Sequence, residues 1–477
     1  MKFKNITVGL LLAGGLFTAC KKSDIFPGPD ASISAETVFS TPDRIEKASV
    51  GMYDALQNAN FFSGRVLIYA DIRGLDAIPS AYFGNMGFYT STNSQDATVA
   101  SAWQGGYRTI YQANLFLKGF TPKMSMVPQA KADQYVGEAK FIRALCYFYL
   151  VNLWGQPYNF TADASHPGVP LMLKVEDDPF SAANNLPRAT VKQVYDQMET
   201  DLLDAQAKLP ETPADAFTRV ARATKGAATA LLARLYLYKG DWTKANQMAD
   251  LLIASPAAYA LNAGNPVLAF RPPFTTKESI FSVAMSGADN PNTNASLGQH
   301  YGGGSLNGRG DISISVSYLN LMDTNVDLRY KGKGGDALME RSPTGVFWTR
   351  KYAGLTTDFV PVLRYAEIVL IKAEALANLA ATVDATAVTL VNSIRTRSSA
   401  APIAPVTKQD LLDAIIKERR IELAFEGQGS LEFNRNKQDI PAHSSVPLQA
   451  WGTDYRVLPI PKYDTDKNPG ETQNHGY

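Results

Sequence analysis

The chain has 477 residues, which is enough for one large core or two to three ordinary domains. Its 46 basic and 45 acidic residues give a net charge of +1. This balance argues against a nucleic-acid-binding protein, which needs a basic face. Aromatic residues make up 10% and charged residues 19% of the chain. We expect most of the rings to fill the core and some to line a ligand surface.

Residues 1–19 predict a secretory signal peptide. Lys2 and Lys4 precede an apolar run over 6–18, and small residues come just before Cys20. Small residues before a cysteine at this place resemble the bacterial lipobox, in which the cysteine is acylated and becomes the first residue of the mature protein. We therefore expect lipidation of Cys20 and a flexible tether over 20–40. The alternative is an ordinary signal followed by an accidental cysteine.

Only one other cysteine exists, Cys146, so no disulfide framework can stabilise the fold. Cys146 lies in an apolar stretch, where we expect a small buried hydrophobic residue. After residue 20 no apolar run reaches the roughly 18 residues that are needed to cross a bilayer.

Helical patterns begin after Thr41, a predicted N-cap that is followed by Pro42 at the first helical position. A second helical stretch covers 107–118, and Gly119 predicts its end. Four further stretches look like helix hairpins or parts of them. They cover 134–154, 221–253, 365–396 and 408–425.

The clearest hairpin is 221–253. Small residues line its first helix, Gly240 is a natural C-terminal stop, and Trp242 opens the return helix. A small-residue helix, a glycine turn and an aromatic-led second helix resemble a tetratricopeptide unit. Such units must stack to bury their faces, which predicts a curved helical superstructure.

Two stretches interrupt the helical pattern, near 58–101 and 277–361. Both are rich in aromatic residues, Gly and Asn, and within the second one residues 278–284 predict a short strand. Long ordered loops often carry function. We expect a single binding domain over 41–477 with these two stretches as loop-rich insertions.

Several segments, taken in order, resemble the SusD/RagB family of outer-membrane nutrient-binding lipoproteins. They begin with Glu138-Ala139-Lys140-Phe141-Ile142-Arg143-Ala144 and include Glu418-Arg419-Arg420 with Glu426-Gly427. The matching residues lie within 138–157, 187–202, 223–236, 364–375, 392–395, 418–427 and 459–474. Each match is weak alone, but their order together with a lipidated start is specific.

The resemblance implies a mainly α fold of about four tetratricopeptide-like helix pairs, with long insertions and a few short strands. It also implies a lipoprotein of the outer membrane that faces the cell exterior. Such a protein captures a nutrient and caps a SusC-like TonB-dependent transporter. Glycans are the usual ligand class, and peptides are the alternative.

The chain departs from the family pattern at two places. After Glu426-Gly427 the family usually carries an arginine and bulky aromatic residues, whereas this chain reads Gln428-Gly429-Ser430-Leu431. The departure predicts different local packing and the loss of one internal ion pair. Behind Cys20 the chain carries Lys21-Lys22-Ser23-Asp24, where acidic residues favour export to the cell surface.

Catalytic patterns are missing from the sequence. The four histidines show no His-Glu-x-x-His spacing, and no Gly-x-Ser-x-Gly elbow occurs. Glu418, Glu422 and Glu426 share one helical face, and paired carboxylates can hydrolyse glycosides. We expect them instead to form structural ion pairs with Arg419, Arg420 and neighbouring helices. The sequence therefore predicts no enzyme and no cofactor. It also predicts no metal site, because no calcium-loop spacing occurs.

A sugar-binding site needs aromatic platforms and polar side chains that reach the hydroxyl groups. The insertions supply both, so we selected candidates by their chemistry, since no family motif aligns there. Trp103, Tyr107, Trp154 and Trp242 lie in or beside helical patterns, and we expect them in the core. A tethered scaffold that binds other proteins is the competing hypothesis. The candidate ligand-binding residues are Arg73, Tyr82, Tyr89, Asn93, Tyr301 and Trp348.

Overall fold

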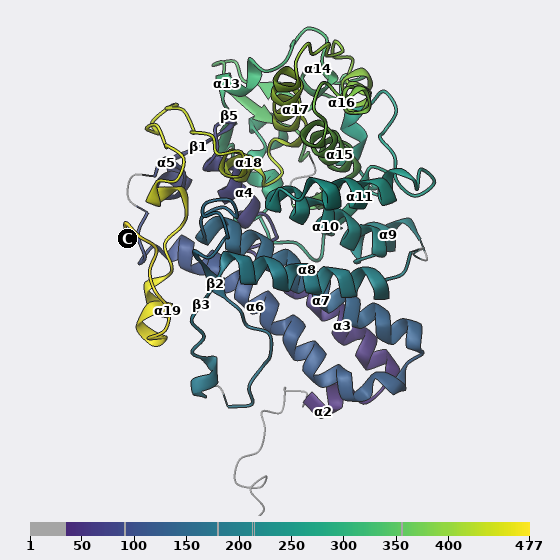
Figure 1. Ribbon diagram of the computed structural model, residues 1–477, viewed down its shortest axis with the longest axis vertical. Helices are drawn as coiled ribbons and strands as arrows, with labels where there is room; N and C mark the ends of the chain where they lie inside the picture. Colours follow the sequence, from purple (N-terminus) through teal and green to yellow (C-terminus); the bar gives the residue numbers. More distant parts are fainter. Residues whose placement is uncertain (1–34, 90–91, 179–180, 212, 214, 354–355) are drawn as a thin grey trace, which may run out of the picture.

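The structure is a computed structural model that describes residues 35–477 except 90–91, 179–180, 212, 214 and 354–355. Helices dominate it and stack upon one another from α3 at the lower end of the view to α16 at the upper end (Figure 1). This confirms the predicted mainly α fold. The longer helices are α3 (Pro42–Leu56), α4 (Arg65–Ile72), α6 (Ala97–Phe120), α7 (Gln129–Trp154), α8 (Val191–Lys208), α10 (Lys225–Lys239), α11 (Trp242–Ile253), α15 (Tyr365–Leu379), α16 (Ala385–Arg397) and α17 (Lys408–Leu423).

Shorter helical elements fill the connections between the long helices. The short α-helices are α2 (Ala35–Val38), α5 (Gly84–Phe88), α9 (Ala216–Ala221), α12 (Leu297–Tyr301), α13 (Val316–Leu319), α14 (Leu328–Lys331), α18 (Gly429–Arg435) and α19 (Lys462–Lys467). The 3₁₀ turns are η1 (Ala81–Phe83), η2 (Thr121–Met126), η3 (Ala182–Asn184), η4 (Pro266–Phe270), η5 (Gly304–Leu306) and η6 (Asp454–Arg456).

The hairpin predicted over 221–253 is confirmed by α10 and α11. Gly240 adopts a φ of +70°, and its N–H donates to the Leu237 carbonyl, so the chain reverses at this glycine. Thr224 caps the first helix by accepting the Ala227 N–H at 3.1 Å. The pair packs onto the next one, because α11 lies against α15.

The remaining helix pairs follow the same packing. Helix α7 lies against both α6 and α8, α8 lies against α10, and α15 lies against α16 and α17. The predicted starts at Thr41 and Thr407 are confirmed, since each threonine side chain accepts a backbone N–H of the first turn. Each helix therefore buries a face against its neighbour, as stacked repeats require.

The predicted end at Gly119 is wrong. Helix α6 begins after Asp96, which accepts the Thr98 N–H at 2.8 Å, and it continues to Phe120. Gly119 lies inside the helix. A Cβ atom at this position would come within 2.1 Å of the Phe39 ring, so only glycine fits here. This glycine permits close packing of Phe39 and does not end the helix.

The first insertion holds more regular structure than its sequence pattern predicts. It contains α4, in which every residue from Val66 to Ile72 is buried. A helix that is buried all round lacks the alternation of apolar and polar faces by which an amphipathic helix is recognised. The stretch therefore gave no helical period.

The strands are short and form two-stranded antiparallel pairs. The strand expected over 278–284 is confirmed as β4, which pairs with β8. This pairing places the two ends of the second insertion side by side on the helical frame. The strands are β1 (Ala77–Pro79), β2 (Pro167–Pro170), β3 (Arg188–Thr190), β4 (Ser279–Val283), β5 (Ile312–Ile314), β6 (Met339–Arg341), β7 (Phe347–Thr349) and β8 (Val360–Arg364).

One large apolar core runs through the helical frame and contains the central part of α7. Cys146 is fully buried there, as predicted, and burial raises the pKa of its thiol. Trp103 and Trp154 are buried, whereas Tyr107 and Trp242 are only partly buried against the core. Among the helices that the structure describes, none is both long and apolar enough to cross a membrane.

The C-terminal segment returns along the helical frame. The Leu458 N–H donates to the Leu153 carbonyl at 2.7 Å, and the Trp154 indole N–H donates to the Pro459 carbonyl at 3.0 Å. From there the chain forms α19, which runs in yellow beside β2, β3 and α6 (Figure 1). The last residues of the chain thus lie against the end of α7.

Candidate functional site

The two insertions meet through a pair of short strands. Strand β1 of the first insertion pairs with β5 of the second, with Ala77 opposite Ile314 and Pro79 opposite Ile312. Strand β5 also contacts β7, which pairs with β6. Aromatic and polar residues that are more than 200 positions apart in the chain are thereby brought to one place. We call the junction of the two insertions, which contains Tyr82, Arg309 and Trp348, the insertion site.

Tyr82 is the most exposed of the candidate aromatic residues, with 46% of its surface accessible. It lies in η1, where its hydroxyl accepts a hydrogen bond from Arg65 Nη2 at 2.8 Å. The Arg309 guanidinium lies 4.5 Å from the centre of the ring, and that of Arg65 lies 5.3 Å from it. The ring and two guanidinium groups thus form one surface, in which cation–π contacts fix the arginines.

Trp348 lies on β7 and contacts Gly310, the residue that follows Arg309. Its indole N–H donates to the Gly310 carbonyl at 3.2 Å. A Cβ atom on Gly303 would meet the Trp348 ring at 2.7 Å, so the glycine-rich stretch rests directly on the indole. Because Arg309 covers Tyr82 and Gly310 contacts Trp348, two successive residues connect the two candidate rings.

Arg309 is held in place by a polar network. It donates to Asp311 Oδ2 at 2.6 Å and to Asn294 Oδ1 at 2.7 Å, and His300 Nδ1 lies 2.9 Å from the same Asp311 oxygen. Burial acts to raise the pKa of Asp311, but hydrogen bonds from Arg309 and His300 outweigh it and lower that pKa. Burial lowers the pKa of His300. The network fixes the guanidinium over the Tyr82 ring.

A polar cavity of about 380 Å³ opens beside Tyr82 and Arg65. Asn85, Asp96 and Thr98 contribute polar groups to its lining. This size fits a small ligand, and the chemistry suits one that offers hydroxyl groups and an apolar face.

Three of the candidate residues are buried inside the fold. Arg73 donates to the Met86 carbonyl at 3.0 Å, and its guanidinium lies 4.1 Å from the Tyr89 ring centre. The Tyr89 hydroxyl donates to the Arg73 carbonyl. Tyr301 is fully buried and donates to Asp71 Oδ2 at 2.8 Å. In this structure these side chains hold the first insertion together beneath the insertion site.

Asp71 of α4 joins the first insertion to Tyr301 of the second insertion and to the chain that follows α17. Besides Tyr301 it accepts the N–H groups of Gly427 and Gly429, at 2.9 and 3.0 Å. Burial raises the pKa of Asp71 to about 6, against the effect of these hydrogen bonds. Gly429 follows the Glu426-Gly427 pair, in the stretch that departs from the family pattern. A Cβ atom there would meet Asp71 Cα at 2.9 Å, so the glycine is what lets its backbone approach this carboxylate.

Asn93 is exposed and lies in the turn that leads into α6. Its side-chain oxygen accepts the Gln95 N–H at 2.9 Å. Cys20, the predicted lipidation site, lies outside the described residues. Of the six candidate ligand-binding residues, the structure brings Tyr82 and Trp348 to the insertion site.

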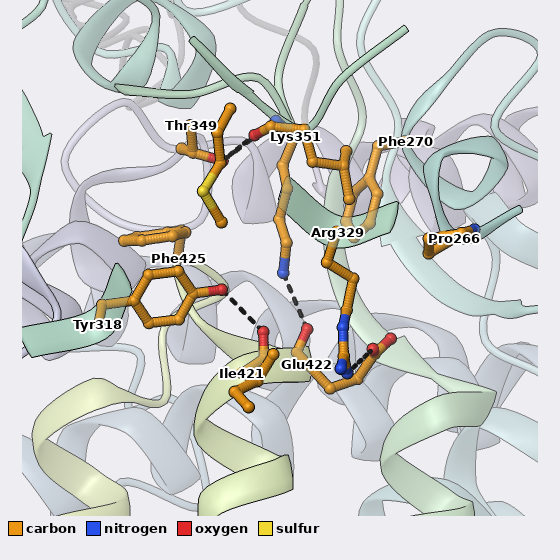
Figure 2. Close-up of a pocket in the computed structure, with 11 residues that line it drawn as sticks. Pro266, Phe270, Tyr318, Arg329, Thr349, Lys351, Ile421, Glu422 and Phe425 are labelled. Atoms are coloured by element: carbon orange, nitrogen blue, oxygen red, sulfur yellow. Dashed lines mark hydrogen bonds and ion pairs between the residues drawn. The ribbon is translucent and has the colours of Figure 1, made fainter. Parts of the chain in front are cut away.

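The carboxylates of α17 are structural in this fold. The pocket in Figure 2 is closed and has a volume of about 10 Å³, room for roughly one water molecule. In it the Arg329 guanidinium reaches the Glu422 carboxylate, and the Lys351 ammonium donates to the Glu422 carbonyl at 2.9 Å (Figure 2). A substrate has no access to these acids.

The expected ion pairs form with residues of neighbouring elements, as predicted, but not with Arg419 and Arg420. Glu418 pairs with Arg329 and Arg395, Glu422 with Arg364 and Arg397, and Glu426 with Lys351 and Arg364. Burial acts to raise the pKa of Glu422, but four surrounding cations lower it well below its usual range. The predicted partners Arg419 and Arg420 point elsewhere, because Arg419 binds Glu432 and Arg420 binds Asp76.

Arg65 and Arg309 were missed in the sequence. Arg65 opens α4, whose other residues are apolar apart from Asp71, and an isolated charge ahead of an apolar run is a signal that could have been noticed. Arg309 carries no such signal, since its role depends on the approach of Tyr82 from the first insertion.

Glu422→Gln should lower the free energy of unfolding by about 3–5 kcal/mol, because it leaves buried guanidinium groups without their counter-charge. Urea denaturation followed by circular dichroism measures this loss. The control is Asp43→Asn, which breaks only an exposed pair with Lys47 and should change stability by less than about 1 kcal/mol. Equal effects of the two substitutions would contradict a structural role of Glu422.

Comparison with known proteins identifies the family. A model described as "Starch-binding associating with outer membrane" matches residues 28–237, and the model of the SusD family matches residues 342–477. A SusD-like protein P2 of Formosa agariphila is 25% identical, over 88% of this chain and 89% of the relative.

Solved structures agree with this comparison. A SusD superfamily protein of Bacteroides fragilis is 28% identical with a TM-score of 0.78, covering 91% of this chain and 100% of that one. A second, from Bacteroides vulgatus, is 27% identical with a TM-score of 0.79, covering 92% and 99%. A structure described as a "Putative sugar binding protein" of that species is 25% identical with a TM-score of 0.77, covering 92% and 99%. The description of this last neighbour agrees with the expectation of a binding protein. The chain belongs to the SusD/RagB family.

Proposed function

We propose that this protein is an outer-membrane lipoprotein that captures a glycan at the insertion site and delivers it to a TonB-dependent transporter. The observation that carries the proposal is the position of Tyr82 and Trp348 on either side of Arg309–Gly310. Membership of a family whose model is described as starch-binding and associated with the outer membrane supports it.

The chemistry of the insertion site suits an oligosaccharide. Sugar rings have an apolar face that packs on aromatic rings and a rim of hydroxyl groups that needs donors and acceptors. Tyr82 supplies an accessible ring, and the forked guanidinium of Arg309 supplies donors whose direction is already fixed by Asp311 and Asn294. A prearranged site loses little conformational entropy when the ligand binds.

Tyr82→Ala and Trp348→Ala should each weaken glycan binding by about tenfold, which corresponds to about 1.4 kcal/mol, because each removes one ring of the site. Isothermal calorimetry against a panel of polysaccharides measures the affinity. Tyr463→Ala, which removes an exposed ring on α19, is the matched control and should bind as the unchanged protein does.

Unchanged affinity in a folded Tyr82→Ala/Trp348→Ala double variant would remove both rings from the site. Binding of peptides but of no polysaccharide in the same panel would instead identify a peptide-binding member of the family. Shortening of the polysaccharide during incubation would indicate a glycosidase.

The lipid anchor follows from Cys20. In cells fed an alkyne-tagged fatty acid, the unchanged protein should take up the label and sediment with outer membranes. Cys20→Ala should abolish the label and leave the signal peptide uncleaved. The matched control is Cys146→Ala, which alters only a buried thiol and should keep the label. Antibody labelling of intact cells tests whether the anchored protein faces the exterior.

The transporter partnership has a separate test. We expect a TonB-dependent barrel of the same cell to co-purify with the tagged protein when membranes are dissolved in a mild detergent. Recovery of the protein alone under conditions that keep other membrane complexes intact would contradict this partnership. The Tyr82→Ala variant should retain the partner, because it alters the ligand site and not the anchor.

A further inference from the structure

A second cleft lies between α6 and the C-terminal segment. It has a volume of about 390 Å³ and shares no lining residue with the cavity beside Tyr82. Helix α19 and the segment that follows it line one side, and residues of the chain from β2 toward β3 line another. Nothing in the proposed glycan capture uses this cleft.

One wall of the cleft is aromatic. Trp103, Tyr107 and Tyr111 follow one another at intervals of four residues, so they share one face of α6. The Trp103 and Tyr107 ring centres are 4.8 Å apart, and the Tyr107 hydroxyl donates to the Pro170 carbonyl at 2.7 Å. From the sequence we expected Trp103 and Tyr107 in the core, yet both also line this cleft.

The same cleft is lined by two carboxylates, each with one oxygen that has no hydrogen-bond partner. Glu471 is only 8% exposed, and its Oε1 atom has no hydrogen-bond partner. Asp464 Oδ2 is also buried and without a partner. The Trp103 side chain hydrogen-bonds the Asp464 carboxylate. Two desolvated acids with free oxygens are costly unless a donor or a positive charge satisfies them.

Arg108 and Lys467 also line the cleft, but neither forms an ion pair with Asp464 or Glu471 in the described part of the chain. Burial raises the pKa of Glu471 to about 7, and the neighbouring Asp464 raises it further. Arg188 is the nearby cation that lowers this pKa, but its guanidinium donates to the carbonyls of Gly168, Pro167 and Thr472. Within the part of the chain that the structure describes, neither carboxylate forms an ion pair.

We propose that this cleft binds a small ligand through its protonated primary amine. The ammonium group sits between Asp464 and Glu471, and the body of the ligand lies on the rings of Tyr107 and Tyr111. An ammonium group has three donors and satisfies both unused oxygens, and aromatic rings attract the cation as well. The same amine chemistry occurs in amino sugars and at the amino terminus of peptides.

A divalent cation fits less well. Calcium takes six to eight oxygen ligands, whereas this cleft offers two carboxylates. Among the described residues, no three His, Cys, Asp or Glu side chains come together to hold a metal ion. The aromatic wall also has no role in metal binding, but it has one in holding the body of an organic amine.

Saturation-transfer NMR and calorimetry on the mature full chain test the proposal with two matched pairs of probes. Glucosamine is compared with N-acetylglucosamine, and alanyl-alanine with its N-acetyl form. We expect at least one of the two free amines to bind and both acetylated forms to fail, because acetylation removes the charge. The amine that binds identifies the source as an amino sugar or a peptide terminus.

Variants locate the binding. Glu471→Gln and Asp464→Asn should each weaken amine binding by roughly tenfold or more, since each removes one charged acceptor. The control is Asp466→Asn, an exposed acid on the same helix whose partner is Lys462, and it should bind as the unchanged protein does. If Glu471→Gln fails to fold, the partly exposed Asp464 provides the test.

Equal binding of free and acetylated probes, full affinity in Glu471→Gln or Asp464→Asn, or no binding of either amine would overturn the proposal. Tyr82→Ala and Trp348→Ala should leave amine binding unchanged. Failure of glycan capture at the insertion site and failure of amine binding at this cleft are therefore separate results.

Discussion

A buried array of charges joins the second insertion to the helical frame. Glu422, in the last turn of α17, and Glu426, just after that helix, bind Arg364, which is the last residue of β8. Glu426 also binds Lys351, which belongs to the insertion itself. Arg364 also binds Glu278 at 2.7 Å, next to the start of β4. Both ends of the insertion and a point within it are thus tied to one helix.

The buried array is stable only when every charge in it has a partner of opposite sign. Moving each charge out of water is costly, and the mutual attraction offsets this cost only when every charge has its partner. Hydrophobic contacts could hold the insertion with similar strength, but they are not directional. The guanidinium groups demand carboxylates at particular angles, so they define one position of the insertion on the frame.

The position of the insertion in turn decides what lies at the surface. Once β4 and β8 are fixed, β5 reaches β1 and β7 lies beside β5, which places Trp348 and Arg309 next to Tyr82. The Asp71 carboxylate strengthens the same junction by hydrogen bonds with Tyr301 and Gly427. The insertion site and the cleft at Glu471 differ in character, since guanidinium groups surround the first and carboxylates with free oxygens line the second.

The sequence by itself determined the helical class, the helix starts at Thr41 and Thr407, the chain reversal at Gly240 and the family. Caps such as Thr407 and the turn at Gly240 act through their own neighbours in the chain, so local chemistry specifies them. It also predicted that the α17 acids form ion pairs. Only the tertiary structure decided their partners, the burial of Arg73 and Tyr301, and the meeting of Tyr82 with Trp348. These depend on contacts between residues hundreds of positions apart, and no local pattern in a single sequence encodes which distant segment a side chain will meet.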